Sequence, residues 1–141
     1  MALAEIGARA LSNRLPKLIT PRTHAIIDYA TAGTFFLMSG LLWKRHKRAA
    51  IAALACGIHQ TTHALVTDHP GGVAGVVSFP THGKLESGFA GIVTSLPNLL
   101  GFSDSWPALY FRSQGMAIAA AAGMTNFGAN GHRRRDREFA A

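Results

Sequence analysis

The sequence is poor in charged residues and nearly lacks cysteine. Asp, Glu, Lys and Arg make up 15% of the 141 residues, whereas 48% are hydrophobic; soluble domains usually carry roughly 25% charged residues. The single cysteine, Cys56, excludes an intrachain disulfide and a paired-cysteine metal site. The sequence also lacks a glycine-rich phosphate loop and a nucleophile elbow. No complete catalytic set is present, which favours a protein that is not an enzyme.

The charges that are present gather in three segments, 9–22, 44–48 and 133–138, and the net charge is +7. These segments flank long apolar stretches, which is where Lys and Arg set membrane topology and contact anionic lipid. Nucleic acid is the other common partner of a basic chain. The basic tail has no interleaved aromatic residues for stacking on bases, so we expect no nucleic-acid binding.

Four apolar stretches approach the length of about 20 residues that a membrane-spanning helix needs. They cover residues 25–43, 49–66, 85–102 and 108–127. They predict an all-α fold: a bundle of four transmembrane helices arranged as two helical hairpins. Glu86, Pro97 and Arg112 weaken the third and fourth stretches as membrane spans, so a soluble Ala-rich bundle is the structural alternative.

An internal repeat predicts that the two hairpins are tandem copies. Sliding the sequence along itself until His24 falls on His82 also aligns Asp28 with Glu86, Ala32 with Ala90 and Thr67 with Thr125. Because each copy holds two spans, both copies should enter the membrane in the same direction. They would then be related by a pseudo-twofold axis along the membrane normal.

The chain is thereby divided into five predicted units. They are an amphipathic interfacial helix at 1–20, a first hairpin at 21–69, a linker loop at 70–78, a second hairpin at 79–127 and a basic tail at 128–141. We expect a bacterial inner membrane location with both termini cytoplasmic. More Lys and Arg lie on that side of the spans than in the 44–48 turn.

Two segments resemble the SPW-repeat family of small bacterial membrane proteins. They are Pro21-Arg22-Thr23-His24-Ala25-Ile26-Ile27-Asp28-Tyr29 and Leu96-Pro97-Asn98-Leu99-Leu100-Gly101-Phe102-Ser103. The family pattern has a His, then Asp-Tyr, a Gly and later a Pro-Trp-Leu-Leu-Gly-Phe-like element. The resemblance extends over residues 21–127 and implies a repeated membrane hairpin, with no established chemistry. The chain departs from the pattern at Asn98, at Glu86-Ser87 and in the His pair of the second span.

Ionisable residues within the apolar stretches are the candidate functional residues, because such groups are costly in a membrane and are retained for use. His24 and Asp28 are four residues apart and share one helix face, and His82 with Glu86 repeat this spacing. In an antiparallel hairpin, His63 should reach the depth of Asp28. We expect four histidines, His59 included, and the two carboxylates to gather in one layer, where imidazole and carboxylate suit iron, zinc or manganese. Alternatively, the carboxylates favour the positive helix start and the histidines tie helix to loop.

His59 and His63 are also one helical turn apart and suggest a haem or chlorin site between facing helices. Two histidines on one helix cannot bind both faces of one haem. A bis-histidine haem therefore needs one of them together with His24 or His82. The alternative is hydrogen bonding between membrane helices.

Gly115, Ala119 and Gly123 form a stripe of small residues on the fourth apolar stretch, which favours close helix packing. The expected function is a non-catalytic accessory or structural subunit. It would pack in the lipid bilayer against larger membrane proteins or further copies of itself. The alternative is a cofactor protein whose histidines bind haem, chlorin or a metal ion for redox or electron transfer.

Overall fold

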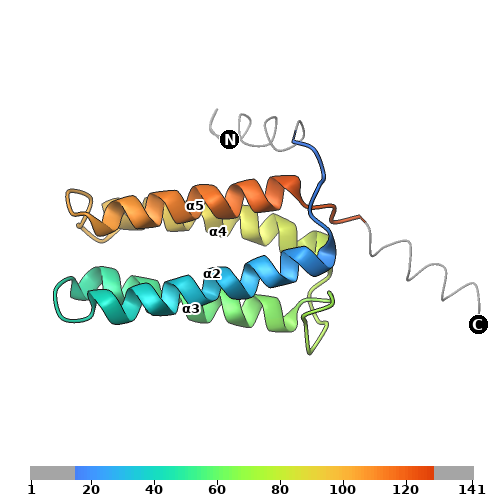
Figure 1. Cartoon of the computed structure of the whole chain (residues 1–141), viewed down its shortest axis with the longest axis horizontal. Coiled ribbons are helices and arrows are strands. Elements are labelled where there is room, and N and C mark those ends of the chain that lie inside the picture. The colour runs from blue at the N-terminus through green and yellow to red at the C-terminus, as the bar shows by residue number, and fades with distance from the viewer. Residues whose placement is uncertain (1–14, 129–141) are drawn as a thin grey trace, which may run out of the picture.

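The computed structural model describes residues 15–128, which form four α-helices. The helices are α2 (Pro21–Leu42), α3 (Lys47–Val66), α4 (Phe79–Leu99) and α5 (Pro107–Met124). Within these residues the only β-type pairing is two isolated bridges, so the predicted all-α fold with four helices is confirmed. α2 pairs with α3, and α4 pairs with α5. The two hairpins lie side by side with both short turns at one end (Figure 1).

Helices α2 and α4 begin before the apolar stretches do. Each starts one residue after a hydroxyl N-cap: Thr20 accepts from the backbone N–H of Thr23, and Ser78 accepts from that of Thr81. Such a cap satisfies a helix N–H that has no partner within the helix. The caps therefore extend both helices over the polar residues ahead of the apolar run. They also place the starts of α2 and α4 at the same end of the bundle (Figure 1).

The predicted interfacial helix at 1–20 falls largely outside the described residues, as does the basic tail from residue 129. The last part of the predicted interfacial helix, residues 15–20, is not helical. The backbone N–H of Ile19 donates to Met124 O at 3.0 Å, and that of Asn126 donates to Ile19 O at 3.1 Å. Asp68 N donates to Val77 O at 2.8 Å in the same way after α3. These bonds tie the connecting segments to the ends of the helices.

Among the described residues, two helices, α2 and α3, are long and apolar enough to cross a membrane. Large apolar side chains nevertheless point outward from all four helices. They include Ile26, Leu37 and Leu41 on α2, Ile51 and Ile58 on α3, Leu85, Ile92 and Leu99 on α4, and Leu109 and Met116 on α5. Apolar surface spread over a whole bundle indicates contact with lipid or with other proteins.

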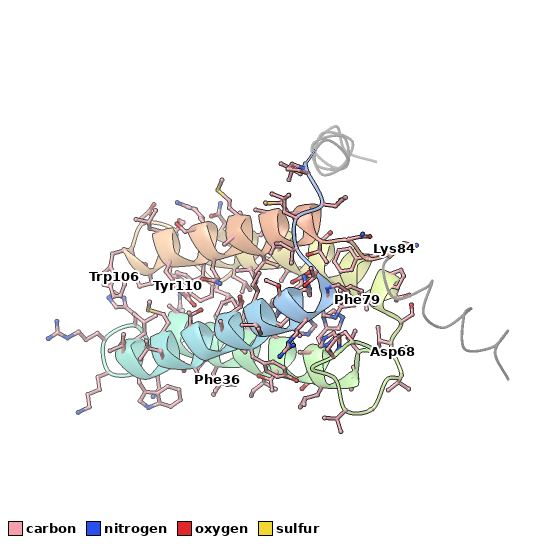
Figure 2. All side chains as sticks on the ribbon, turned by 45° about the vertical axis from the view of Figure 1, so that its right-hand side comes forward. Phe36, Asp68, Phe79, Lys84, Trp106 and Tyr110 are labelled. Carbon is pink, nitrogen blue, oxygen red and sulfur yellow. The ribbon has the colours of Figure 1, made fainter. Side chains whose placement is uncertain are left out.

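The interior has an apolar half and a polar half. The apolar half lies towards the turns and contains Phe35, Leu42, Ala49, Ala53, Phe89, Val93 and Phe111. The polar half lies at the opposite end and contains His24, Asp28, Gln60, His63, Thr67, His69, His82, Glu86 and Thr125. Figure 2 shows Phe79 at the polar end and Trp106 at the turn end. Because buried polar groups need partners, the polar half is where a functional site is expected.

Candidate metal centre

Four ionisable side chains meet where the two hairpins pack together. His24 and Asp28 come from α2, and His82 and Glu86 come from α4. None of the four is more than 2% exposed. One ligand atom from each lies within 4.8 Å of the others. The structure thus brings together both His–carboxylate pairs that the sequence places one turn apart, and each hairpin contributes half of the group.

The atoms that converge are imidazole nitrogens and carboxylate oxygens. The Nε2 atoms of His24 and His82 are 3.1 Å apart. His24 Nε2 lies 3.2 Å from Glu86 Oε2 and 3.5 Å from Asp28 Oδ1, and His82 Nε2 lies 3.3 Å from Asp28 Oδ2. Ligands about 2.0–2.2 Å from one metal ion are about 2.8–3.6 Å from each other. These four spacings fall within that range, whereas His82 Nε2 lies 3.9 Å from Glu86 Oε2, so an ion would have to draw this pair slightly closer.

Two threonine hydroxyls determine which nitrogen of each histidine carries its proton. Thr125 Oγ1 donates to the carbonyl oxygen four residues back at 2.6 Å, and Thr67 Oγ1 does the same at 2.6 Å. A hydroxyl has one hydrogen, so each oxygen must accept from the ring nitrogen beside it. These nitrogens are His24 Nδ1 at 2.7 Å and His82 Nδ1 at 2.8 Å. In the neutral rings both Nε2 atoms then present lone pairs to each other.

The hydrogen bonds to the threonines also connect the two hairpins. His24 on α2 is held by Thr125 at the end of α5, and His82 on α4 is held by Thr67 at the end of α3. Each contact has its counterpart at the equivalent positions of the repeat. A histidine whose second ring nitrogen is hydrogen-bonded has a fixed ring orientation. Metal-ligating histidines are held in this way.

A positive charge between these groups would stabilise their convergence. Two nitrogen lone pairs repel at this distance, and two carboxylates that share a buried space also repel. Asp28 Oδ2 and Glu86 Oε2 have no hydrogen-bond partner. An uncompensated buried charge costs several kcal/mol. One metal ion would be bound by all four side chains together, whereas protons would have to bind to the individual nitrogens and oxygens.

Two residues that the sequence did not single out as site residues face Asp28. Gln60 Nε2 donates to Asp28 Oδ1 at 3.0 Å. His69 Nδ1 accepts a hydrogen bond from the backbone N–H of Gly71 at 3.0 Å. In the neutral ring the hydrogen is therefore on Nε2, which faces Asp28 Oδ2 at 3.8 Å. Burial lowers the pKa of His69, which favours the neutral ring. Gln60 thus supports the carboxylate in the manner of an outer partner at a metal site, whereas His69 faces it from beyond hydrogen-bond distance.

His63 and His59 contribute no atom to the group of four. The His63 ring stacks on His82, with centroids 4.1 Å apart and planes 2° from parallel. Both of its nitrogens lack a hydrogen-bond partner. His59 is exposed and packs against Phe89, with centroids 4.3 Å apart. His63 therefore supports the face of a ligand ring, and His59 lies at the outer surface.

The geometry does not suit a haem or chlorin held between two histidines. Axial ligands to a haem point at the iron from opposite sides of the macrocycle, and 3.1 Å between His24 Nε2 and His82 Nε2 leaves no room for one. His63 and His82 face each other with their ring planes rather than their nitrogens. The donor set therefore fits a bare metal ion.

Aromatic rings cover the group at the end of the bundle. Phe79 and Phe127 contact the His24 ring edge-on, with centroid distances of 5.5 and 5.2 Å, and lie 4.7 Å from each other. Gly83 leaves room for this cover, since a Cβ there would lie 2.6 Å from the Phe127 ring. Excluding water lowers the effective dielectric constant and strengthens the attraction between buried carboxylates and a cation.

The small-residue stripe of α5 packs partly inside the bundle. Gly115 is buried against Thr94 and Ala90 of α4, where a Cβ has no space. Gly123 is buried and its carbonyl accepts from Lys17 Nζ at 2.6 Å, whereas Ala119 is exposed. Close packing of Gly115 within the second hairpin explains its small size.

Comparisons of the chain with models of protein families, with curated proteins and with solved structures found no match.

Proposed function

We propose that this chain is a small membrane-embedded metalloprotein whose two hairpins are joined by one divalent transition-metal ion. The ligands are His24, Asp28, His82 and Glu86. The observation that carries the proposal is the convergence of two Nε2 lone pairs and two carboxylates at one buried point. Each histidine is already oriented for binding through its Nδ1 hydrogen bond.

The donor set favours zinc, iron(II) or manganese(II). Imidazole with carboxylate suits these ions, whereas magnesium and calcium prefer oxygen ligands. Two ionised carboxylates and a divalent ion also sum to no net charge. A neutral centre avoids the desolvation cost of a buried charge, so the interior of the bundle can accept it.

The role of the ion in this proposal is structural. Four protein ligands complete a tetrahedral shell and leave no open position for a substrate, which is typical of structural rather than catalytic zinc sites. One His–carboxylate pair from each hairpin makes the ion a cross-link between α2 and α4. The bundle exterior stays free, so the chain can also serve as an accessory subunit beside other membrane proteins or further copies of itself.

Several features support a membrane location. α2 and α3 have the length and composition of spans, and the exposed apolar side chains extend over α4 and α5 as well. Arg112, a polar group on α5, donates to Asn98 Oδ1 of α4 at 3.2 Å, and such pairing lowers the cost of a charge in lipid. Four spans in a bacterial inner membrane, cytoplasmic termini and membership of the SPW-repeat family remain predictions.

Metal analysis of the full chain tests the metal centre. The protein, purified in detergent on a tag that binds no metal, should contain about one zinc, iron or manganese ion per chain by mass spectrometry. His82→Ala should lose it. His46→Ala is the matched control, because His46 lies at the turn end against Trp106 and should leave the metal in place. A wild-type protein that contains none of these ions and does not take them up would refute the metal centre in favour of a protonated cluster.

Chelation and membrane extraction test the two remaining parts separately. Removing the ion should lower the melting temperature in detergent, since an ion at 100 times its Kd stabilises by about 2.7 kcal/mol. His82→Ala should show no such response to the chelator. The chain should also sediment with membranes and resist alkaline extraction. Release into the supernatant would contradict the membrane location but would not contradict the metal centre.

A further inference from the structure

An apolar groove lies between α3 and α4, and none of the four candidate metal ligands lines it. Its volume is about 530 Å³, and it is lined by Arg48, Ile51, Ala52, Ala55, Cys56, His59, Phe89, Ile92, Leu96 and Leu100. Two of these residues carry strongly polar groups, and they lie at opposite ends. Arg48 is at the turn end of α3, and His59 is about half-way along the helix. The groove is thus a long apolar channel with a cation at one end.

The length of the groove matches one leaflet of a bilayer. His59 lies 11 positions after Arg48 on α3, a rise of about 16 Å at 1.5 Å per residue. Half of the hydrocarbon core of a membrane is about 15 Å thick. With the turn at the membrane surface, the inner end of the groove reaches the middle of the bilayer.

The turn end is suited to an anionic head group. Arg48 is the only Lys or Arg among the residues that line the groove, and none of the lining residues is acidic. The Arg48 guanidinium reaches the α4–α5 turn, where its Nη1 would lie 3.3 Å from a Cβ at Gly101. It therefore lies across the mouth of the groove. Guanidinium groups bind phosphate through two parallel hydrogen bonds.

We propose that this groove binds one acyl chain of an anionic phospholipid, with the phosphate at Arg48 and the chain end at His59. The apolar walls accept the chain, since Ile51 and Ile92 are more than half exposed along it. The lipid is held at a defined site on the bundle. This inference depends on the membrane location proposed above and is independent of the metal ion.

Native mass spectrometry of the full chain from detergent tests the lipid site. After addition of phosphatidylglycerol, one lipid per chain should be retained. Arg48→Gln should reduce retention at least about tenfold, as expected for the loss of a charge-assisted hydrogen bond. Arg45→Gln is the matched control: it makes the same change of charge in the same turn, and Arg45 does not line the groove. It should retain the lipid.

A second variant tests the channel itself. Ala55→Trp fills an exposed part of the groove and should also abolish retention, while an unchanged metal content shows that the bundle is intact. Equal retention of phosphatidylglycerol and phosphatidylcholine, or equal losses in Arg45→Gln and Arg48→Gln, would overturn the site in favour of non-specific surface charge. Binding of oleate in place of phosphatidylglycerol would overturn the phospholipid assignment. A chain that sediments with membranes and holds its metal, yet retains no lipid, refutes this inference alone.

Discussion

The two carboxylates of the candidate metal centre, Asp28 and Glu86, have different surroundings, although they align in the internal repeat. Asp28 Oδ1 accepts from Gln60, and its Oδ2 faces His69. The repeat equivalents of these two partners are Ile118 and Phe127, whose side chains have no polar atom. Asp28 Oδ2 and Glu86 Oε2 both lack a hydrogen-bond partner, and Glu86 Oε2 lies 3.2 Å from His24 Nε2. The difference is therefore the amide of Gln60, which holds one oxygen of Asp28 and has no polar counterpart in the second hairpin.

This comparison predicts the largest effect at Glu86. Glu86→Gln keeps the shape of the side chain and removes one of the two negative charges that would balance the ion. Metal affinity should fall by more than about 100-fold, beyond the range for outer partners. Competition with a chromophoric chelator measures the change. Glu86→Asp, which keeps the charge, should lose less, and an affinity of Glu86→Gln equal to that of the wild type would exclude Glu86 as a ligand.

An intermediate effect is expected at Gln60. Gln60→Ile gives the first hairpin the residue type that the second carries at position 118 and removes the donor to Asp28 Oδ1. Metal affinity should fall by about 10–100-fold, the usual cost of losing an outer partner. The same chelator competition applies, with Thr62→Ala as the control, because Thr62 is exposed on the same helix. If both variants bind metal as the wild type does, the difference between the two carboxylates has no consequence for binding.

The smallest effect is expected at His69. His69→Phe copies the residue at position 127 and removes an N–H that faces Asp28 Oδ2 from 3.8 Å, too far for a strong hydrogen bond. Affinity should fall by about tenfold, at the low end of the range for outer partners. Val73→Ala, in the exposed part of the same loop, is the control. A loss larger than that of Gln60→Ile would mean that His69 moves to become a ligand when the ion binds.

The two His–carboxylate pairs of the candidate metal centre could be predicted because their spacing is local. His24 and Asp28, like His82 and Glu86, are one turn apart, so any helix through them brings each pair onto one face. The expected depth of His63 is also close to what the structure has, since its ring lies on His82. Its role differs from the expected one, because the ring presents its face and not a nitrogen. Spacing along a helix determines which face a residue occupies but not how its ring is turned.

The residues that orient the candidate ligands could be predicted from the sequence only in part. Thr67 and Thr125 align in the internal repeat, and this alignment was the available signal for them. Each lies at a helix end, where a hydroxyl commonly bonds to its own backbone. The second role of each threonine, which is to accept the N–H of a histidine ring, is visible only in the structure, because that histidine lies on the other hairpin. His69 depends on the path of the loop after α3, for which spacing gives no indication.

The order of the four helices could be read from the apolar stretches, because burying apolar side chains depends on composition over a whole helix. The apolar stretches alone place the starts of α2 and α4 too late, because a hydroxyl cap extends each helix over polar residues ahead of the apolar run; the helices begin at residues 21 and 79, where the internal repeat places the starts of the two hairpins. This extension decides the site. Without helical backbone at residues 79–84, His82 would not share a face with Glu86.

By itself, the sequence determined the helices, their order and the two His–carboxylate pairs, since each of these follows from neighbours within a few turns. Only the tertiary structure decided that His24 and His82 meet nitrogen to nitrogen, that threonines from the opposite hairpins fix their protons, and that Gln60 and His69 turn towards one carboxylate. The physical reason is that these contacts join residues far apart in the chain. Their distances are set by how the two hairpins pack, and no local pattern specifies that packing.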